Sequence, residues 1–303
     1  MNIDCFCFTV PSLLKNDFII NHEDDENTIW IKTKDQELMD KANECNMLIL
    51  FDRSTKKFYK DNVEYDITDK VIFPRSFIPY EEELLENIEK NGGISIQTNN
   101  DKEKITNWPK FIQPNHRKII TTTYGEFKEN HEDYKKIFNK VFIKTAKKSH
   151  IHTSLGFYGV INFGDAKAFF TNPPLFDLYD NDTIFLTETF KSIADGANDM
   201  HCREYRVFVL NNNLLSISRS YVDYPTIIPD KVLEFANEQI EKTNLIKDFP
   251  SSYVLDIGEI MIDSKEVIDI IEYNPIVSSG LEVCHDLISE LKQNNDIKKL
   301  IQK

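Results

Sequence analysis

Two carboxylates and one amide in the last third of the chain have the types and spacing of a metal site. Asp256 lies in the apolar run SYVLDI, and Glu272 and Asn274 lie two residues apart in the later run VIDIIEYNP. Residues two apart on a strand point to the same face, and Asp256 comes alongside this pair if the two runs form a hairpin. Such oxygen ligands suit Mg²⁺ that bridges phosphates. The alternative is an edge strand with solvated acids, although an unpaired charge inside an apolar run is costly.

This motif and three earlier segments resemble the ATP-grasp enzymes. The pattern D…E-x-N-P is followed by the small residues Ser278-Ser279-Gly280, as in the family's terminal Mg²⁺ motif. The other segments occur in the family's order: Val141–Lys144 (VFIK), Phe185–Phe190 (FLTETF), and Glu204–Val209 (EYRVFV) with the return run Ser216–Arg219. Each segment alone is a weak signal, and it is their shared order that supports the resemblance.

The resemblance implies how ATP is held. In the family a strand lysine reaches the phosphates, a hinge strand binds adenine through its backbone, one arginine contacts the γ-phosphate, and a second lies near the acyl-phosphate. These roles fall on Lys144, on Thr187, Glu188 and Thr189, on Arg206, and on Arg219, with Asp256, Glu272 and Asn274 as the Mg²⁺ ligands. Fixed cations suit this chemistry, because phosphoryl transfer to a carboxylate brings negative charges together. Without that context, Lys144 is a strand-end lysine that reaches to water, and Arg206 is a surface partner of Glu204.

The chain departs from the family after the strand lysine. The usual glycine-rich phosphate flap is replaced by Thr145–His152 (TAKKSHIH), in which Lys147 and Lys148 are expected to contact the phosphates. The alternative is a solvated basic loop. The extra lysines resemble an Arg/Lys-rich clade of phage and bacterial ATP-grasp proteins and, more distantly, the chaperones that assemble eukaryotic initiation factor two. The family's early lysine has no clear counterpart, and its candidates remain Lys110, Arg117 and Lys118.

The elements that position these residues follow from hydrophobic periodicity. The first third alternates strands with helices, which predicts an α/β lobe with a mostly parallel sheet. Its strand candidates are Cys5–Val10, Thr28–Lys32, Met47–Asp52, Val71–Pro74 and Ile94–Gln97. The run Glu81–Lys90 predicts a helix that Asn91-Gly92-Gly93 ends. Arg75 follows a strand of this lobe and is expected to contact a substrate carboxylate, to cap a helix or to form an ion pair.

Beyond a polar connection at Asn99–Asn115, the pattern changes towards antiparallel strands. The candidates are Val141–Lys144, Gly159–Phe163, Ile184–Thr187, Tyr205–Leu210, Leu214–Ser218, Tyr253–Ile257 and Val267–Glu272. Asn211–Asn213 predicts a hairpin turn, Asp230–Thr243 a helix with Asp230 as N-cap, and Leu281 the start of a last helix. We therefore expect an N-terminal lobe at 1–115 and a two-subdomain ATP-grasp domain at 116–303, divided into 116–186 and 187–303, whose antiparallel sheets clasp ATP.

The composition limits the classes of partner. The chain has 303 residues, a formal net charge of -14 and a pI near 5.0, which argues against duplex nucleic acid as the main ligand. Its five cysteines are scattered, without zinc-like spacing, so reduced thiols in the cytoplasm are expected. The absence of a long apolar run predicts that the chain does not cross a membrane.

The resemblance implies a carboxylate–amine ligase. Such an enzyme uses Mg-ATP to form an acyl-phosphate that an amine attacks, with release of ADP and phosphate. The carboxylate could belong to a small molecule, a peptide or a protein. Two alternatives remain, an ATP-binding assembly chaperone of the initiation-factor type and a kinase on the same fold.

Overall fold

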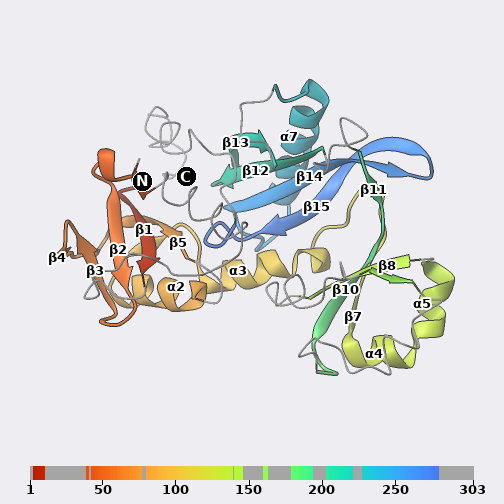
Figure 1. The fold of residues 1–303 in the computed structure, drawn as a ribbon, viewed down its shortest axis with the longest axis horizontal. Coiled ribbons are helices and arrows are strands. Elements are labelled where there is room, and N and C mark those ends of the chain that lie inside the picture. Colours follow the sequence, from red (N-terminus) through yellow and green to blue (C-terminus); the bar gives the residue numbers. More distant parts are fainter. Residues whose placement is uncertain are drawn as a thin grey trace, which may run out of the picture. The chain divides into compact units, whose positions relative to one another are not determined.

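A computed structural model describes residues 3–10, 39–40, 42–76, 80–138, 140–145, 160–162, 179–193, 203–220 and 227–279 (Figure 1). Three sheets account for the strands of these ranges. Each sheet carries residues that the sequence analysis singled out.

The first sheet has the strand order β4-β3-β2-β1-β5-β6. Its strands are β1 (Cys5–Val10), β2 (Leu48–Asp52), β3 (Lys57–Lys60), β4 (Val63–Glu64), β5 (Val71–Arg75) and β6 (Ile94–Ser95). β1 is parallel to both β2 and β5, and β5 is parallel to β6, as expected for an α/β lobe. The short strands β3 and β4 add an antiparallel edge that the periodicity did not predict.

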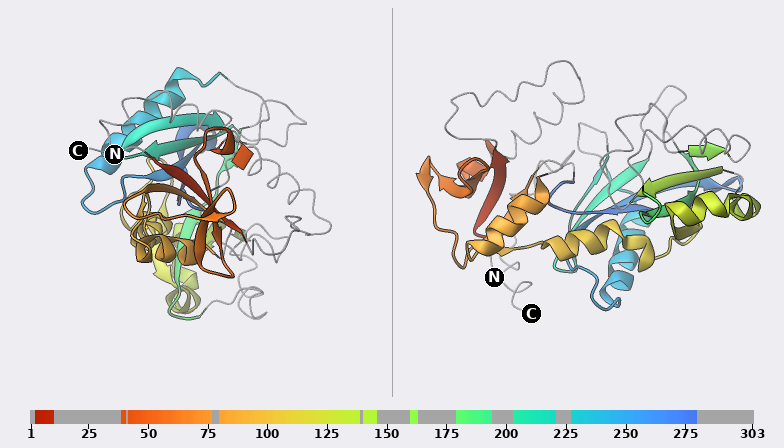
Figure 2. Two further views of the ribbon diagram at one scale, coloured as in Figure 1. Left: turned by 90° about the vertical axis from the view of Figure 1, so that its left-hand side faces the viewer. Right: turned by 90° about the horizontal axis from the view of Figure 1, so that it is seen from below.

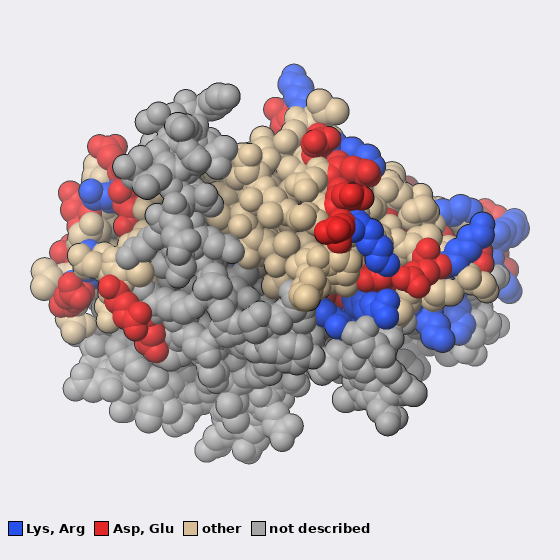
Figure 3. All heavy atoms as spheres, turned by 90° about the horizontal axis from the view of Figure 1, so that it is seen from above, with Lys and Arg blue, Asp and Glu red and all other residues tan. Residues whose placement is uncertain are grey.

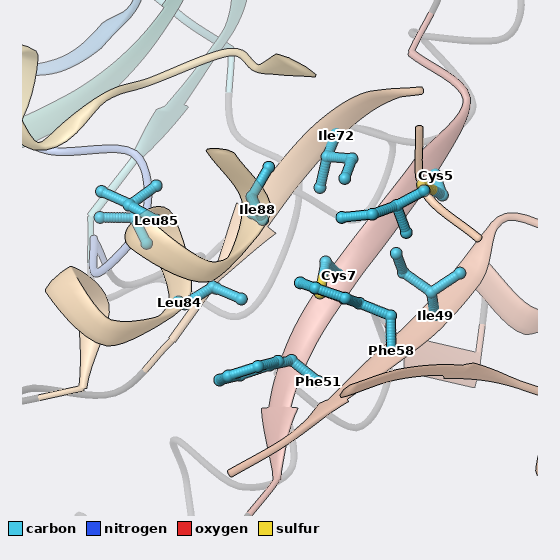
Figure 4. Close-up of a cluster of buried hydrophobic side chains, with 11 residues drawn as sticks. Cys5, Cys7, Ile49, Phe51, Phe58, Ile72, Leu84, Leu85 and Ile88 are labelled. Atoms are coloured by element: carbon cyan, nitrogen blue, oxygen red, sulfur yellow. The ribbon is translucent and has the colours of Figure 1, made fainter. Parts of the chain in front are cut away.

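Helix α2 (Glu81–Lys90) covers one face of this sheet and has the predicted bounds. Acidic residues occupy its first turn, where they complement the helix dipole. Gly92 just beyond its end has a φ of 74°, a left-handed conformation that glycine adopts at little cost. The apolar side chains of α2 meet those of β1, β2 and β5 in one buried cluster (Figure 4): Cys5, Cys7, Ile49, Phe51, Ile72, Leu84, Leu85 and Ile88.

The second sheet is antiparallel, with the order β7-β10-β8-β9. Its strands are β7 (Ile119–Thr123), β8 (Lys140–Thr145), β9 (Val160–Asn162) and β10 (Thr183–Glu188). Helices α4 (Tyr124–Glu129) and α5 (His131–Ile137) follow β7, and Phe127 of α4 is fully buried with Val141 and Ile184. A capping box between Thr123 and Glu126 starts α4.

The third sheet carries most of the predicted chemistry. Its order is β11-β14-β12-β13, and β15 pairs with β14. The bounds are β11 (Lys191–Ser192), β12 (Glu204–Leu210), β13 (Asn213–Arg219), β14 (Tyr253–Ile262) and β15 (Lys265–Asn274). Figures 1 and 2 show the long strands β14 and β15 side by side, which confirms the predicted hairpin.

Two tight turns set the pairing within this sheet. Asn211 and Asn212 have φ of 51° and 63°, and Asp263 and Ser264 have φ of 49° and 63°. Two consecutive positive φ values are typical of the turns that match the twist of antiparallel strands. Helix α7 (Asp230–Asn244) packs against β13.

The described residues fall into two compact units. One lies within Met1–Lys102, Tyr205–Asp256 and Asn274–Lys303, and the other within Glu103–Glu204 and Ile257–Tyr273. The predicted boundaries of the lobe and subdomains stay a prediction.

The structure corrects two details of the expected elements. The polar connection at Asn99–Asn115 contains helix α3 (Asn99–Thr106) and the 3-10 helix η1 (Trp108–Lys110). Low apolar content hid α3, since only Ile105 of that helix is buried. The N-cap of α7 is Pro229, so Asp230 is the first helical residue. The expected strand at Thr28–Lys32 and the helix from Leu281 lie outside the described residues.

Three of the five cysteines lie in described segments and carry free thiols. Cys5 and Cys7 are buried on the same face of β1, and Cys45 is half-buried. Burial raises the pKa of the Cys5 thiol to about 12, with a smaller contribution from the charge of Asp4. Both β1 thiols therefore behave as small apolar core groups. No helix in the described ranges is long and apolar enough to cross a membrane.

Candidate functional site

Asp256, Arg206 and Asn274 form a hydrogen-bonded cluster on β12, β14 and β15. The Arg206 guanidinium donates from Nε to Oδ1 of Asp256 and from Nη2 to Oδ2, each at 2.8 Å. Asn274 donates from Nδ2 to Oδ2 of Asp256, also at 2.8 Å. The side chains of Arg206 and Asp256 are only 12% and 7% exposed. This two-point geometry fixes the orientation of both planes, because the guanidinium fork matches a carboxylate.

A second ion pair joins the strand lysine to the third predicted metal ligand. Nζ of Lys144 on β8 lies 2.9 Å from Oε2 of Glu272 on β15. Both side chains are about a quarter exposed. Glu272 lies two residues before Asn274 on the same strand. Each of the two carboxylates predicted to bind the metal is thus paired with one of the two cations predicted to bind phosphate.

The types of the predicted ligands, two carboxylates and an amide, fit a metal ion that is bound jointly by protein and phosphate oxygens. No group of three or more His, Cys, Asp or Glu side chains in the described segments is arranged to hold a metal ion by itself. Mg²⁺ is usually bound through one or two carboxylates while phosphates and water complete its shell. Asp256 with Asn274 in one unit, and Glu272 in the other, are oxygen ligands of the types that Mg²⁺ uses, and each acid pairs with a cation of its own unit.

The predicted adenine segment lies at the end of β10. Thr187 is buried, and Glu188 and Thr189 are half-buried. The backbone N–H of Glu188 donates to the carbonyl of Lys118 at 3.0 Å, and the N–H of Lys118 donates to Oε2 of Glu188 at 3.1 Å. The Glu188 side chain therefore fastens the segment to the residue that precedes β7.

Arg219 does not share a face with Arg206. In the β12–β13 hairpin Arg219 lies opposite Tyr205, while Ser218 lies opposite Arg206. Opposed residues of an antiparallel pair point the same way and consecutive residues point opposite ways, so the two arginines lie on opposite faces. The role that the resemblance gives to Arg219 stays a prediction. Lys147 and Lys148 lie outside the described residues.

Arg75 of the first lobe points into the protein. It is only 5% exposed, and its Nη1 donates to the carbonyl of Ile276 at 2.5 Å, just beyond Asn274. Gln97, which sequence reasoning missed, holds the same loop. Its amide donates to the carbonyl of Ser252 and accepts from the N–H of Val277, both at 3.2 Å. The two side chains thereby hold the chain on either side of β14 and β15.

One face of the molecule carries charged side chains of both signs. The face drawn in Figure 3 shows Lys and Arg interspersed with Asp and Glu.

The comparisons with known proteins identify the fold. No protein-family model matches the sequence, and no curated protein matches it. Similar solved structures include D-cycloserine synthetase DcsG, 11% identical with a TM-score of 0.57 over 98% of this chain and 99% of that one. D-alanyl-alanine synthetase A from Vibrio cholerae is 10% identical, with a TM-score of 0.54 over 99% of this chain and 100% of the other. The ATP-grasp ligase PsnB, solved with a variant of its minimal precursor, Mg and ADP, is 12% identical, with a TM-score of 0.51 over 96% and 99%. The chain has the α/β ATP-grasp fold, which confirms the predicted fold class.

Proposed function

We propose that this protein is an ATP-dependent carboxylate–amine ligase that works through an acyl-phosphate. The observation that carries the proposal is the pairing of Arg206 with Asp256 and of Lys144 with Glu272. These are the cations and acids that the motif order assigns to phosphate and to Mg²⁺. The similarity to solved structures that include D-cycloserine synthetase DcsG and the ATP-grasp ligase PsnB supports the same class of reaction.

In this proposal the residues of the chain bind and orient Mg-ATP and neutralise the charge of its phosphates. With Mg-ATP bound, Lys144 and Arg206 would contact phosphate oxygens and neutralise their charge. The acids Asp256 and Glu272, with Asn274, would hold Mg²⁺, which would supply charge neutralisation. Fixed cations are effective here because they need no reorganisation as charge develops.

Further parts of the proposal rest on the sequence. Thr187, Glu188 and Thr189 bind adenine, and Lys147 and Lys148 cover the triphosphate as in the Arg/Lys-rich clade. The ATP-grasp domain covers 116–303, and the protein works in the cytoplasm. The acceptor amine attacks the acyl-phosphate directly, so the reaction needs no histidine base.

One incubation tests the reaction class. The protein is mixed with Mg-ATP, pooled amino acids and hydroxylamine, and ADP and new masses are followed. Hydroxamate formation or an amide product, each with stoichiometric ADP, is the expected result. A phosphorylated product without amide or hydroxamate would instead identify a kinase. ATP binding without ADP release would identify an assembly factor.

A further inference from the structure

A buried ion pair lies next to the predicted adenine segment. The side chains of Arg117 and Asp269 are 2% and 0% exposed, with 3.4 Å between Nε and Oδ2. Nη2 of Arg117 also donates to the carbonyl of Ile270. Asp269 accepts from the backbone N–H groups of Asn115 at 3.0 Å and His116 at 3.3 Å. The pair thus fastens residues 115–117 to β15.

The same short stretch holds the adenine segment on its other side. The guanidinium of Arg117 lies over the ring of Phe190, 4.6 Å from its centroid. Lys118, the next residue, exchanges two hydrogen bonds with Glu188. Residues 115–118 therefore connect the strand of Glu272 to the segment 188–190.

Stability alone does not account for this arrangement. A buried ion pair adds little to the free energy of unfolding compared with apolar side chains of similar volume, since removing both charges from water is expensive. Burial lowers the pKa of the Arg117 guanidinium, and the charge of Asp269 opposes that shift. What the pair does supply is geometry, because a planar fork is held on its edge by two acceptors and on its face by a ring.

We propose that Arg117 and Asp269 are positioning residues that set the preference for adenine over guanine by holding the backbone of residues 188–190. This inference rests on the proposed use of ATP. Adenine and guanine differ in the donors and acceptors of the edge that a hinge backbone contacts. Backbone groups reject the wrong base only if they are held to about 0.5 Å, because a mobile segment adapts to either pattern.

Arg117→Lys is the sharpest variant. The lysine keeps a positive charge opposite Asp269, but one ammonium group cannot reach Asp269 and Ile270 while also lying flat on Phe190. Calorimetry with Mg²⁺ gives the Kd of ADP, GDP and tripolyphosphate. The Kd of ADP should rise about tenfold, that of GDP should change less than about threefold, and that of tripolyphosphate should stay the same. Asp269→Asn should shift the ADP:GDP preference in the same direction.

Phe127→Leu is the matched control, since it weakens the core behind α4 in the same unit without touching this network. It should lower the melting temperature and leave the ADP:GDP preference unchanged. The positioning role is overturned if Arg117→Lys keeps the wild-type ADP:GDP preference. It is also overturned if the Kd values of ADP and tripolyphosphate rise by the same factor. If the wild-type protein itself does not bind ADP, the proposed function fails first, and the two failures are thus distinct.

Discussion

At the scale of single residues, the site consists of charges that already have partners. Arg206 and Asp256 are largely buried, so removing one of them would leave the other uncompensated at a cost of about 3 kcal/mol or more. Lys144 and Glu272 are more exposed, and water screens their attraction. The two pairs therefore differ in how strongly a substitution should affect folding.

Glu272→Gln separates chemistry from stability. The amide keeps the shape of the side chain but removes the charge proposed to hold Mg²⁺, so ADP production should fall at least about tenfold, a change of about 1.4 kcal/mol. The free energy of unfolding should change by less than about 1 kcal/mol, since the pair with Lys144 is partly solvated. Steady-state ADP release and urea unfolding measure the two effects.

Glu266→Gln provides the control for that variant. Glu266 lies on the same strand, and its side chain is 47% exposed. It should retain wild-type turnover. Wild-type turnover in Glu272→Gln would show that Glu272 is not a metal ligand.

Lys147 and Lys148 should differ from each other. If the loop is extended, the two adjacent side chains point to opposite sides, so one ammonium group is expected to cover the triphosphate and exclude water from it. Replacing that lysine with Ala should weaken ATP binding or turnover by about tenfold or more, or about 1.4 kcal/mol. The other Ala variant should stay within about 0.5 kcal/mol of wild type. A nucleotide complex with both ammonium groups far from phosphate would contradict this prediction.

At the scale of elements, hairpins and helix caps determine where the site residues are placed. The turn at Asp263 and Ser264 brings β15 back along β14, and the turn at Asn211 and Asn212 does the same for β12 and β13. The capping box of α4 secures the helix that packs behind β8 and β10. Each of these turns and caps is local, so its contribution to the free energy of unfolding can be measured separately.

The α4 capping box predicts a pH dependence. The backbone N–H of Thr123 and the hydroxyl of Thr122 donate to Glu126 and lower the pKa of its carboxyl below 4.5. Because the folded pKa is depressed, the carboxylate stabilises the fold above about pH 4.5, and this contribution is lost as the pH falls through the folded pKa.

Glu126→Gln tests that sign, since Gln can still complete the box without a charge. The melting temperature of wild type should exceed that of Glu126→Gln near pH 6, and the difference should shrink towards about pH 3. Thr123→Ala should cost about 1 kcal/mol through loss of the cap itself. A difference between wild type and Glu126→Gln that does not change with pH would exclude the carboxylate as its source.

At the scale of the whole molecule, ligand binding should appear as stability. A ligand that binds only the native state stabilises it by RT ln(1 + [L]/Kd), about 2.7 kcal/mol at a hundredfold excess over Kd. Mg-ATP at millimolar concentration should therefore raise the melting temperature. Mg²⁺ alone, and ATP with a chelator, should each have a smaller effect, because only Mg-ATP supplies both a metal for the proposed acidic ligands and phosphates for Lys144 and Arg206. An unchanged melting temperature with Mg-ATP would count against the proposed function.

The order of motifs and the alternation of apolar residues were sufficient to predict the fold class, β1, α2 and the β14–β15 hairpin. The strand, the helix and the hairpin depend on local periodicity and turn chemistry, which a single sequence contains, and the fold class followed from the resemblance in motif order. The same reasoning named Arg206, Asp256, Lys144 and Glu272 as candidates. It could not pair them, because their partners lie 50 and 128 residues away.

Only the tertiary structure decided those partners and the positioning contacts behind them. Asp269 stands in an apolar run, which signals a buried acid in need of a partner, but nothing local names Arg117. Gln97 gave no signal at all, since an amide at the end of a short strand is ordinarily solvated. The faces of Arg206 and Arg219 likewise depended on the register across a turn, where a shift of one residue reverses every side chain. Long-range pairing is a property of the packed chain, and it decides which of the predicted residues meet.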